Sequence, residues 1–133
     1  NWVLLNSDGI VKLDLGIGAA GGVVCDRNGD WIFGYDRHLG QCSVFDAELW
    51  GILDGLMLLQ KQGYKKVVIQ SDNLQVVKAI RDNLLEDSNL VLIKRIQQVL
   101  QHESHWLLRH VPKEKNQVAD CITKMSFDKR EDL

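Results

Sequence analysis

Hydrophobic residues change their spacing near residue 46, and this change strongly limits the folds that the chain can adopt. Before it, apolar runs at residues 2–8, 16–26 and 31–35 predict three strands. The Asn-Gly pair at residues 28–29 is a strong signal for a tight hairpin turn, since both residues tolerate positive φ. After residue 46, apolar residues recur at the spacing of one face of a helix. The pattern therefore predicts an antiparallel meander that leads into a helix.

Helices and strands alternate along the rest of the chain. The first helix begins near Asp46 and ends before Gly63, and its glycines Gly51 and Gly55, one turn apart, indicate close packing against a sheet. The elements that follow are a strand over 66–70, a helix over 76–84 that is broken around 86–88, a helix over 92–100, a strand over 105–111 and a helix over 116–124. Strands separated by helices run parallel, because the crossover returns the chain to the same end of the sheet. We therefore predict an α/β fold with a five-stranded mixed sheet, three antiparallel strands followed by two parallel ones, flanked by helices.

The length of 133 residues suits a single domain with a buried core. We expect this domain to span residues 1–127, with a charged, frayed tail at 128–133. The hydrophobic content of 45% and the charged content of 26% are those of an ordinary soluble globular protein. No apolar run approaches the roughly 20 residues that span a bilayer, so we expect no membrane partner. A monomer inside the cell, in the nucleus or cytoplasm, is the expected state.

Net charge and cysteine content exclude few functions. A net charge of −2 gives weak support to nucleic-acid binding, although metal ions would neutralise acidic residues locally. The three cysteines, Cys25, Cys42 and Cys121, are too few and too scattered for a disulfide framework. The sequence has no C-x-x-C pair, which argues against a zinc cluster. We expect buried free thiols in a reducing compartment.

Four carboxylates lie where the hydrophobic pattern changes. Asp8 ends the first apolar run, Glu48 opens the first helical pattern, Asp72 follows the strand over 66–70, and Asp120 follows the last strand. Taken singly, Asp8 in S-D-G and Asp72 in S-D-N could be turn or cap residues. If the fold brings all four to one edge of the sheet, they repel one another unless divalent cations neutralise them. Together they predict a site for a hard metal ion.

The residues around these acids resemble ribonuclease H. The matching segments are S-D-G after the first strand, A-E-L-W at the head of the first long helix, Q-S-D-N after the fourth strand and R-H-V-P-K-E-K-N-Q-V-A-D near the end. The resemblance runs from about Asn6 to Lys124. The segments N-G-D-W-I-F-G-Y and A-E-L-W-G-I-L-D-G-L are similar, more narrowly, to the ribonuclease H-like domains common in plants, which are related to retroelement reverse transcriptases. The resemblance implies the ribonuclease H-like fold and allows the chain to be part of a longer reverse-transcriptase-like protein.

The same resemblance implies a Mg²⁺-dependent endonuclease that cuts the RNA strand of an RNA–DNA hybrid. Asp8, Glu48, Asp72 and Asp120 fall on the family's four metal-binding acids, and His110 falls on its histidine that assists proton transfer or product release. Two Mg²⁺ ions, for which Mn²⁺ can substitute, would lower the pKa of the attacking water and stabilise the leaving 3′-oxygen. Further residues flank the proposed cleft and are candidates for binding the substrate: Lys12, Asn73, Lys113 and Lys115.

The chain departs from better-studied members of the family at positions that grip the substrate. Val44 and Phe45 stand where those enzymes carry polar residues that touch the minor groove of the hybrid, and Asn73 stands where many have serine. Residues 81–88 are acidic, where some members carry a basic protrusion. We therefore expect weak, salt-sensitive binding of the hybrid.

Two other functions remain open. The first is a non-catalytic ribonuclease H-like module that binds nucleic acid or a protein partner, which the loss of groove-reading residues favours. The second keeps the fold and the metals but cuts another nucleic acid, as integrase and resolvase relatives do. The order of the elements favours ribonuclease H over those relatives.

Overall fold

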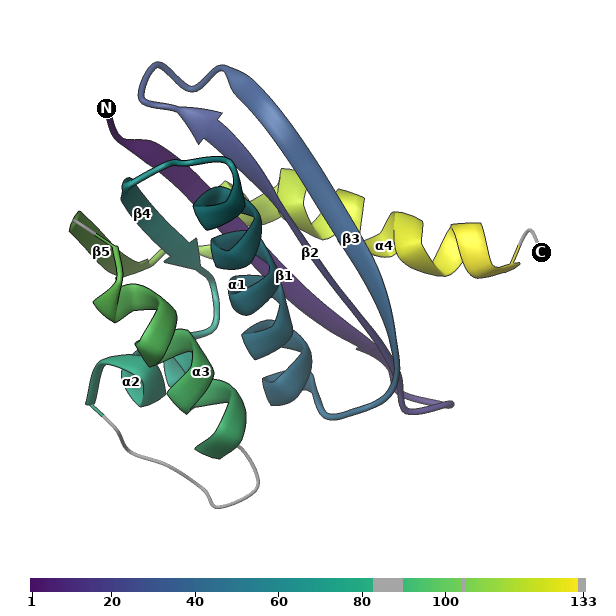
Figure 1. The fold of residues 1–133 in the computed structure, drawn as a ribbon. Coiled ribbons are helices and arrows are strands. Elements are labelled where there is room, and N and C mark those ends of the chain that lie inside the picture. The colour runs from purple at the N-terminus through teal and green to yellow at the C-terminus, as the bar shows by residue number, and fades with distance from the viewer. Residues whose placement is uncertain (83–89, 104, 132–133) are drawn as a thin grey trace.

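The computed structural model describes residues 1–82, 90–103 and 105–131 of the chain. Five strands form one sheet in the order β3-β2-β1-β4-β5 (Figure 1). The strands are β1 (Val3–Lys12), β2 (Ile17–Asp26), β3 (Trp31–Gln41), β4 (Lys66–Ser71) and β5 (His105–His110). The β1–β2 and β2–β3 pairs are antiparallel, whereas the β1–β4 and β4–β5 pairs are parallel. The predicted fold class, a mixed sheet of three antiparallel and two parallel strands, is confirmed.

β1 is longer than the sequence predicts, and its length moves Asp8 from the end of a strand to the interior. The strand continues past residue 8 to Lys12 and stays paired with β2 throughout. On its other side, β1 pairs with β4 only as far as Asn6. β1 therefore passes beyond the end of β4, and Asp8 lies in this overhang. β3 is also longer than the predicted strand over 31–35 and ends at Gln41.

Helices cover both faces of the sheet. On one face lie α1 (Val44–Lys61), α2 (Leu74–Asp82) and α3 (Leu90–Gln101); on the other, a short 3-10 turn, η2 (Lys113–Asn116), leads into α4 (Gln117–Glu131) (Figure 1). The predicted end of the second helix at residue 84 and the break at 86–88 lie outside the described residues. α4 is longer than the predicted helix over 116–124, so residues 128–131 of the expected frayed tail are helical. The domain boundary at residue 127 stays a prediction.

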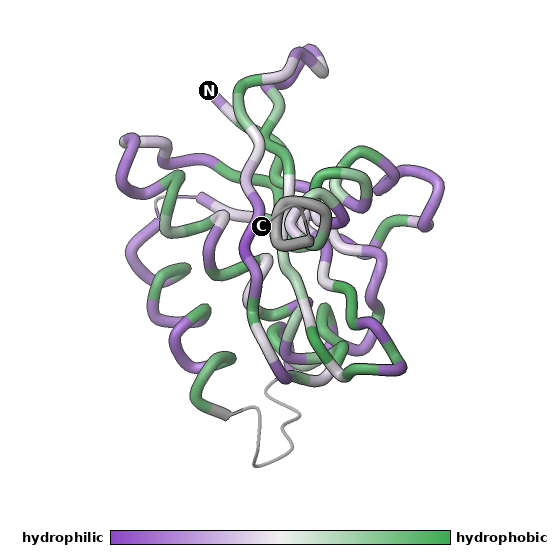
Figure 2. Tube along the Cα trace, turned by 90° about the vertical axis from the view of Figure 1, so that its right-hand side faces the viewer, coloured by the Kyte–Doolittle hydropathy of each residue, from purple (hydrophilic) through white to green (hydrophobic). Residues whose placement is uncertain are grey.

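Ser43 starts α1 earlier than the predicted position near Asp46. Its side-chain oxygen accepts a hydrogen bond from the backbone nitrogen of Asp46 at 3.0 Å, as expected for an N-cap. The face of α1 that the sequence predicts to be apolar packs into the core, where four of its residues are 0–1% exposed: Leu49, Ile52, Leu53 and Leu56. Figure 2 shows hydrophobic and hydrophilic residues alternating along the helices, as expected for helices with one buried face.

β5 forms one edge of the sheet, and an arginine partly covers it. A guanidinium nitrogen of Arg81, in α2, donates a hydrogen bond to the carbonyl oxygen of Leu108. Edge strands expose main-chain groups that can pair with another chain. The Arg81 side chain occupies one of these acceptors and so makes the β5 edge less available for pairing.

The cysteines and the helices bear on two further expectations. All three cysteines are free, as predicted, but Cys25 and Cys42 are only partly buried and Cys121 is exposed. The expectation that they are buried is therefore wrong: Cys25 lies near the end of β2, Cys42 in the connection between β3 and α1, and Cys121 on an exposed position of α4. In the part of the chain that the structure describes, no helix is long and apolar enough to cross a membrane.

Candidate active site

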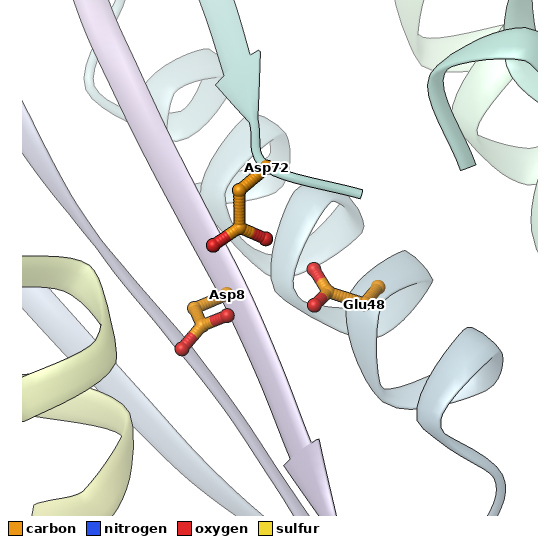
Figure 3. A group of neighbouring side chains, drawn as sticks. All are labelled: Asp8, Glu48 and Asp72. Atoms are coloured by element: carbon orange, nitrogen blue, oxygen red, sulfur yellow. The ribbon is translucent and has the colours of Figure 1, made fainter. Parts of the chain in front are cut away.

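Three carboxylates from three separate elements converge beside the middle of β1. Asp8 comes from β1, Glu48 from α1 and Asp72 from the residue that follows β4 (Figure 3). One oxygen from each carboxylate lies within 4.8 Å of the other two. Asp8 and Glu48 are each only 4% exposed, and Asp72 is half-buried. The structure thus brings together three of the four acids that the sequence singles out.

Two glycines allow the backbone of α1 to lie directly on β1. A Cβ atom at Gly9 would lie 2.2 Å from the backbone nitrogen of Glu48, and one at Gly51 would lie 2.6 Å from the carbonyl oxygen of Asp8. Cβ atoms essentially never approach other atoms within 3.0 Å, so any other residue would push the helix away. This contact sets Glu48 beside Asp8. It confirms the close packing predicted from Gly51, whereas the turn that S-D-G suggests does not form.

The register of the parallel strands sets Asp72 beside Asp8. β1 and β4 pair with Asn6 opposite Gln70, and each aspartate lies two residues further along its own strand. β4 ends at Ser71, so Asp72 leaves the sheet at the level where β1 carries Asp8. The carboxyl ends of parallel strands are the usual location of sites in α/β sheets, and this one follows the rule.

The cluster is electrostatically unfavourable without a cation. Burial raises the pKa of Asp8 to about 8, and the nearby Asp120 and Asp72 carboxylates add to the shift. Burial also raises the pKa of Glu48 to about 9, with further contributions from Asp8 and Asp72. Asp8 Oδ2 and Glu48 Oε2 are buried and have no hydrogen-bond partner among the described residues. Buried carboxylate oxygens without donors are the ligands that Mg²⁺ and Mn²⁺ prefer, so these residues fit a hard divalent ion.

Asp120 lies beside the cluster and pairs with a lysine of its own helix. It does not belong to the group of three mutually close oxygens, and its Oδ2 forms an ion pair with Lys124 Nζ at 2.9 Å, one turn along α4. Partial burial opposes ionisation, but hydrogen bonds with Lys124 and Asp8 lower the pKa of Asp120. A carboxylate that keeps its charge therefore adjoins two that tend to bind protons.

His110 ends β5 at the same edge of the sheet. β5 pairs with β4 so that His110 lies opposite Ser71, the residue before Asp72. The His110 ring nitrogen Nε2 lies 3.2 Å from the backbone oxygen of Asp72, and the side chain is exposed. Because that oxygen can only accept, the contact orients the ring with Nε2 as donor and leaves Nδ1 as the basic nitrogen.

The candidate lysines divide between two hollows. Lys12 and Lys113 line a hollow of about 550 Å³ together with Asp120, next to the acids. Lys115 lines another hollow of about 200 Å³ with Trp31 and Cys25, near the β2–β3 turn. The structure therefore places Lys12 and Lys113, but not Lys115, on the side of α4 that carries Asp120.

Asn73 acts as the N-terminal cap of α2. Its side-chain oxygen accepts a hydrogen bond from the backbone nitrogen of Val76 at 3.0 Å, and its own backbone nitrogen donates to the Ser71 hydroxyl at 3.1 Å. Substrate binding by Asn73 stays a prediction.

Sequence reasoning missed two residues that shape this site, Gly9 and Asn116. Gly9 stands in a motif that also fits a turn, so no local signal distinguishes its role. Asn116 is 1% exposed, and its Nδ2 donates to the carbonyl oxygen of Ser7 at 2.7 Å. Its position in N-Q-V-A-D, one turn before Asp120, is the sequence signal that points to it.

Comparison with protein families now places the chain. The model of the family described as reverse transcriptase-like matches residues 6–126. The chain belongs to this family. The reverse transcriptase-like chain is also 32% identical over 129 residues to an Arabidopsis thaliana protein named "Putative ribonuclease H protein". The alignment covers 95% of this chain and 20% of the relative, so the chain spans about a fifth of the relative's length.

Ribonucleases H are among the solved structures similar to this reverse transcriptase-like chain. Ribonuclease H1 of the archaeon Halobacterium salinarum superposes with a TM-score of 0.90 at 20% identity, covering 97% of this chain and 99% of that one. LC11-RNase H1 in complex with an RNA/DNA hybrid superposes with a TM-score of 0.89 at 21% identity, covering 96% and 98%. At these identities the likeness establishes the fold, and both the predicted resemblance to ribonuclease H and the ribonuclease H-like fold are confirmed.

Proposed function

We propose that this reverse transcriptase-like chain is a divalent-metal-dependent endonuclease that hydrolyses the RNA strand of RNA–DNA hybrids. The observation that carries the proposal is the convergence of the Asp8, Glu48 and Asp72 oxygens within 4.8 Å in a largely buried site. Three mutually repelling carboxylates destabilise a fold unless they bind a cation. Ribonuclease H relatives of this chain support a hydrolase of the nuclease class.

Asp8, Glu48 and Asp72 would hold the metal, with Asp120 beside Asp8 as a further ligand. We propose Mg²⁺, with Mn²⁺ as a substitute, and two ions in all. When bound, such ions lower the pKa of water and neutralise charge on the phosphate. Gly9 and Gly51 contribute by fixing Glu48 against β1, because ligand oxygens must be held in place for a small octahedral ion.

His110 is the proposed proton carrier. Its exposed ring stands at the edge of the cluster, fixed at Nε2 by the backbone oxygen of Asp72. With a proton on Nδ1, the ring can donate it to the leaving oxygen of the substrate. Since the ring lies outside the buried cluster, it can take up another proton from solvent between turnovers.

The substrate would lie over Asp120 and the hollow that Lys12 and Lys113 line. Two lysine amines there can neutralise backbone phosphates without reading sequence. The choice of the hybrid as substrate rests on similar proteins, since one of them was solved in complex with an RNA/DNA hybrid. We expect the binding to be weak, because only these two lysines are proposed to contact the hybrid, and salt-sensitive, because both lysines would act through phosphates.

Cleavage of a labelled RNA–DNA hybrid with Mg²⁺ or Mn²⁺ tests the proposal. Asp72→Asn should abolish cleavage, whereas Asp14→Asn, at an exposed turn residue, should leave it unchanged. Single-stranded RNA, double-stranded RNA and double-stranded DNA, assayed in parallel, should remain intact. Equal cleavage by wild type and Asp72→Asn would refute the proposal, and preferential cleavage of another nucleic acid would replace the hybrid as substrate.

One observation favours a second function, a non-catalytic module that binds nucleic acid or a protein partner. Val44 is 43% exposed at the head of α1, where polar residues that contact a hybrid would be expected. Calorimetry with Mg²⁺ separates the two functions. Binding that disappears in Asp8→Asn supports the nuclease, and no carboxylate-dependent binding supports the module.

A further inference from the structure

Asn116 is a buried polar residue to which the proposed mechanism gives no role. It is the last residue of η2, directly before α4, and is 1% exposed. Its side-chain nitrogen Nδ2 donates a hydrogen bond of 2.7 Å to the carbonyl oxygen of Ser7. Ser7 directly precedes Asp8 in β1, and Asp120 lies one helical turn after Asn116. One hydrogen bond thus ties together the backbones that carry two of the acids.

This bond is made at the point where β1 loses its parallel partner. Asn6 is the last residue of β1 that pairs with β4, so Ser7 is the first residue of the overhang. There the amide of Asn116 supplies a donor to the β1 backbone. The hydrogen bond therefore anchors the start of α4 to the part of β1 that carries Asp8.

The environment of Asn116 indicates that the donor is the useful part of the side chain. Its oxygen Oδ1 is buried and has no hydrogen-bond partner among the described residues. A buried polar atom without a partner is unfavourable, and an apolar residue of similar size would avoid it. The hydrogen bond to Ser7 is the contact that an apolar residue could not make.

We propose that Asn116 is a positioning residue that sets the distance between Asp120 and Asp8. Those two carboxyl groups interact directly, and Asp120 also pairs with Lys124 in the same helix. Without the Asn116 bond, the start of α4 would lose a buried anchor to the β1 backbone, and Asp120 would move relative to the three-acid cluster. This inference rests on the proposed function, since it assigns a role in assembling that same site.

A double-mutant cycle tests the inference. Asn116→Leu should lower kcat for hybrid cleavage by about 10- to 100-fold, as is common for residues that orient metal ligands, with KM changed less than about 3-fold. In an Asp120→Asn background the same change should cost less than about 3-fold, because the residue that it positions is already disabled. An equal loss in both backgrounds overturns the inference.

Thr123→Val is the matched control. Thr123 is 0% exposed in the same helix, and its hydroxyl donates to the Ala119 carbonyl at 2.8 Å, so valine removes a buried hydrogen bond of similar kind that stays within α4. Thr123→Val should leave kcat within about 2-fold of wild type. If it lowers kcat as much as Asn116→Leu does, the effect is general destabilisation and the inference is wrong. Should Asn116→Leu not fold, Asn116→Ser, too short to reach Ser7, replaces it.

Mn²⁺ binding separates failure of the inference from failure of the proposed function. In calorimetry, Asn116→Leu should weaken Mn²⁺ binding about 10-fold in the wild-type background. In the Asp120→Asn background, the same substitution should leave Mn²⁺ binding unchanged. That result supports the inference even if the wild type does not cut the hybrid. Mn²⁺ affinity that is unchanged in both backgrounds contradicts it.

Discussion

Asp8→Asn is expected to stabilise the metal-free protein while it abolishes metal-dependent cleavage. An oxygen of Asp8 lies within 4.8 Å of oxygens of Glu48 and Asp72, in a site where Asp8 is 4% exposed. Two like charges at this separation repel by about 3 kcal/mol at an effective dielectric constant of about 20. Asparagine keeps the shape of the side chain and removes one of the charges, so unfolding should cost about 3 kcal/mol more at a pH where both carboxyls are ionised.

This gain should depend on pH, with a sign set by the raised pKa values. Burial raises the pKa of Asp8 to about 8 and that of Glu48 to about 9, whereas the unfolded chain releases both protons near pH 4. A carboxyl with a raised pKa favours the folded state below pH 4, and this contribution is lost as the pH rises to about 9. Asparagine does not titrate. The advantage of Asp8→Asn should therefore be small near pH 4 and approach about 3 kcal/mol near pH 9.

Urea unfolding in EDTA, followed by tryptophan fluorescence, measures the effect. The free energies of unfolding of wild type and Asp8→Asn are compared at several values between pH 4.5 and pH 9, with Asp14→Asn as an exposed control. Saturating Mg²⁺ should then stabilise the wild type and not Asp8→Asn, because the metal binds only the intact cluster. A variant less stable than wild type, or a gain that is the same at every pH, would refute the reasoning.

Four other substitutions test the structure around the cluster. Gly9→Ala places a Cβ 2.2 Å from the backbone of α1 and should cost about 1–3 kcal/mol of unfolding free energy and lower Mg²⁺ affinity; a neutral effect on both would contradict the close contact. Ser43→Ala removes the α1 cap and should lower stability in thermal unfolding by about 1 kcal/mol without changing Mg²⁺ affinity. Lys12→Gln and Lys113→Gln should each reduce the slope of the logarithm of the hybrid binding constant against the logarithm of salt concentration by roughly 0.7–0.9. Lys61→Gln, at the end of α1, should leave this slope unchanged. Equal slopes for all three variants would show that Lys12 and Lys113 do not contact the substrate.

The fold was predictable from the sequence because spacing of apolar residues is a local property that survives into the structure. Leu49, Ile52 and Leu56 lie at helical spacing and are all buried in α1. Strand length was less predictable. The polar S-D-G segment matches a turn locally, but pairing with β2 and packing under α1 keep Asp8 and Gly9 within β1. Tertiary contacts override the local preference of those residues.

The sequence identifies the acidic residues of the site, but it does not predict how closely each acid lies to the others. The sequence names Asp120 as an equal of the other acids, whereas the structure holds it in an ion pair with Lys124, outside the closest group of three. That difference depends on which way α4 lies on the sheet. Asn116 was similarly hidden, since its partner Ser7 is 109 positions away in the chain. Contacts of this range leave no periodic signal in one sequence.

Every part of the site is positioned by a contact with β1, so insertions and deletions should be tolerated in some parts of the chain and not in others. α1 contacts β1 at Gly9, β4 pairs with β1 in parallel register, and the start of α4 is hydrogen-bonded to the Ser7 carbonyl. One residue added between Asn6 and Ser7 would turn Asp8 to the opposite face of the sheet and shift Ser7 and Gly9 out of their contacts. Added residues in the β2–β3 turn would disturb none of them. Length variation among relatives should therefore accumulate at such turns and spare residues 3–12.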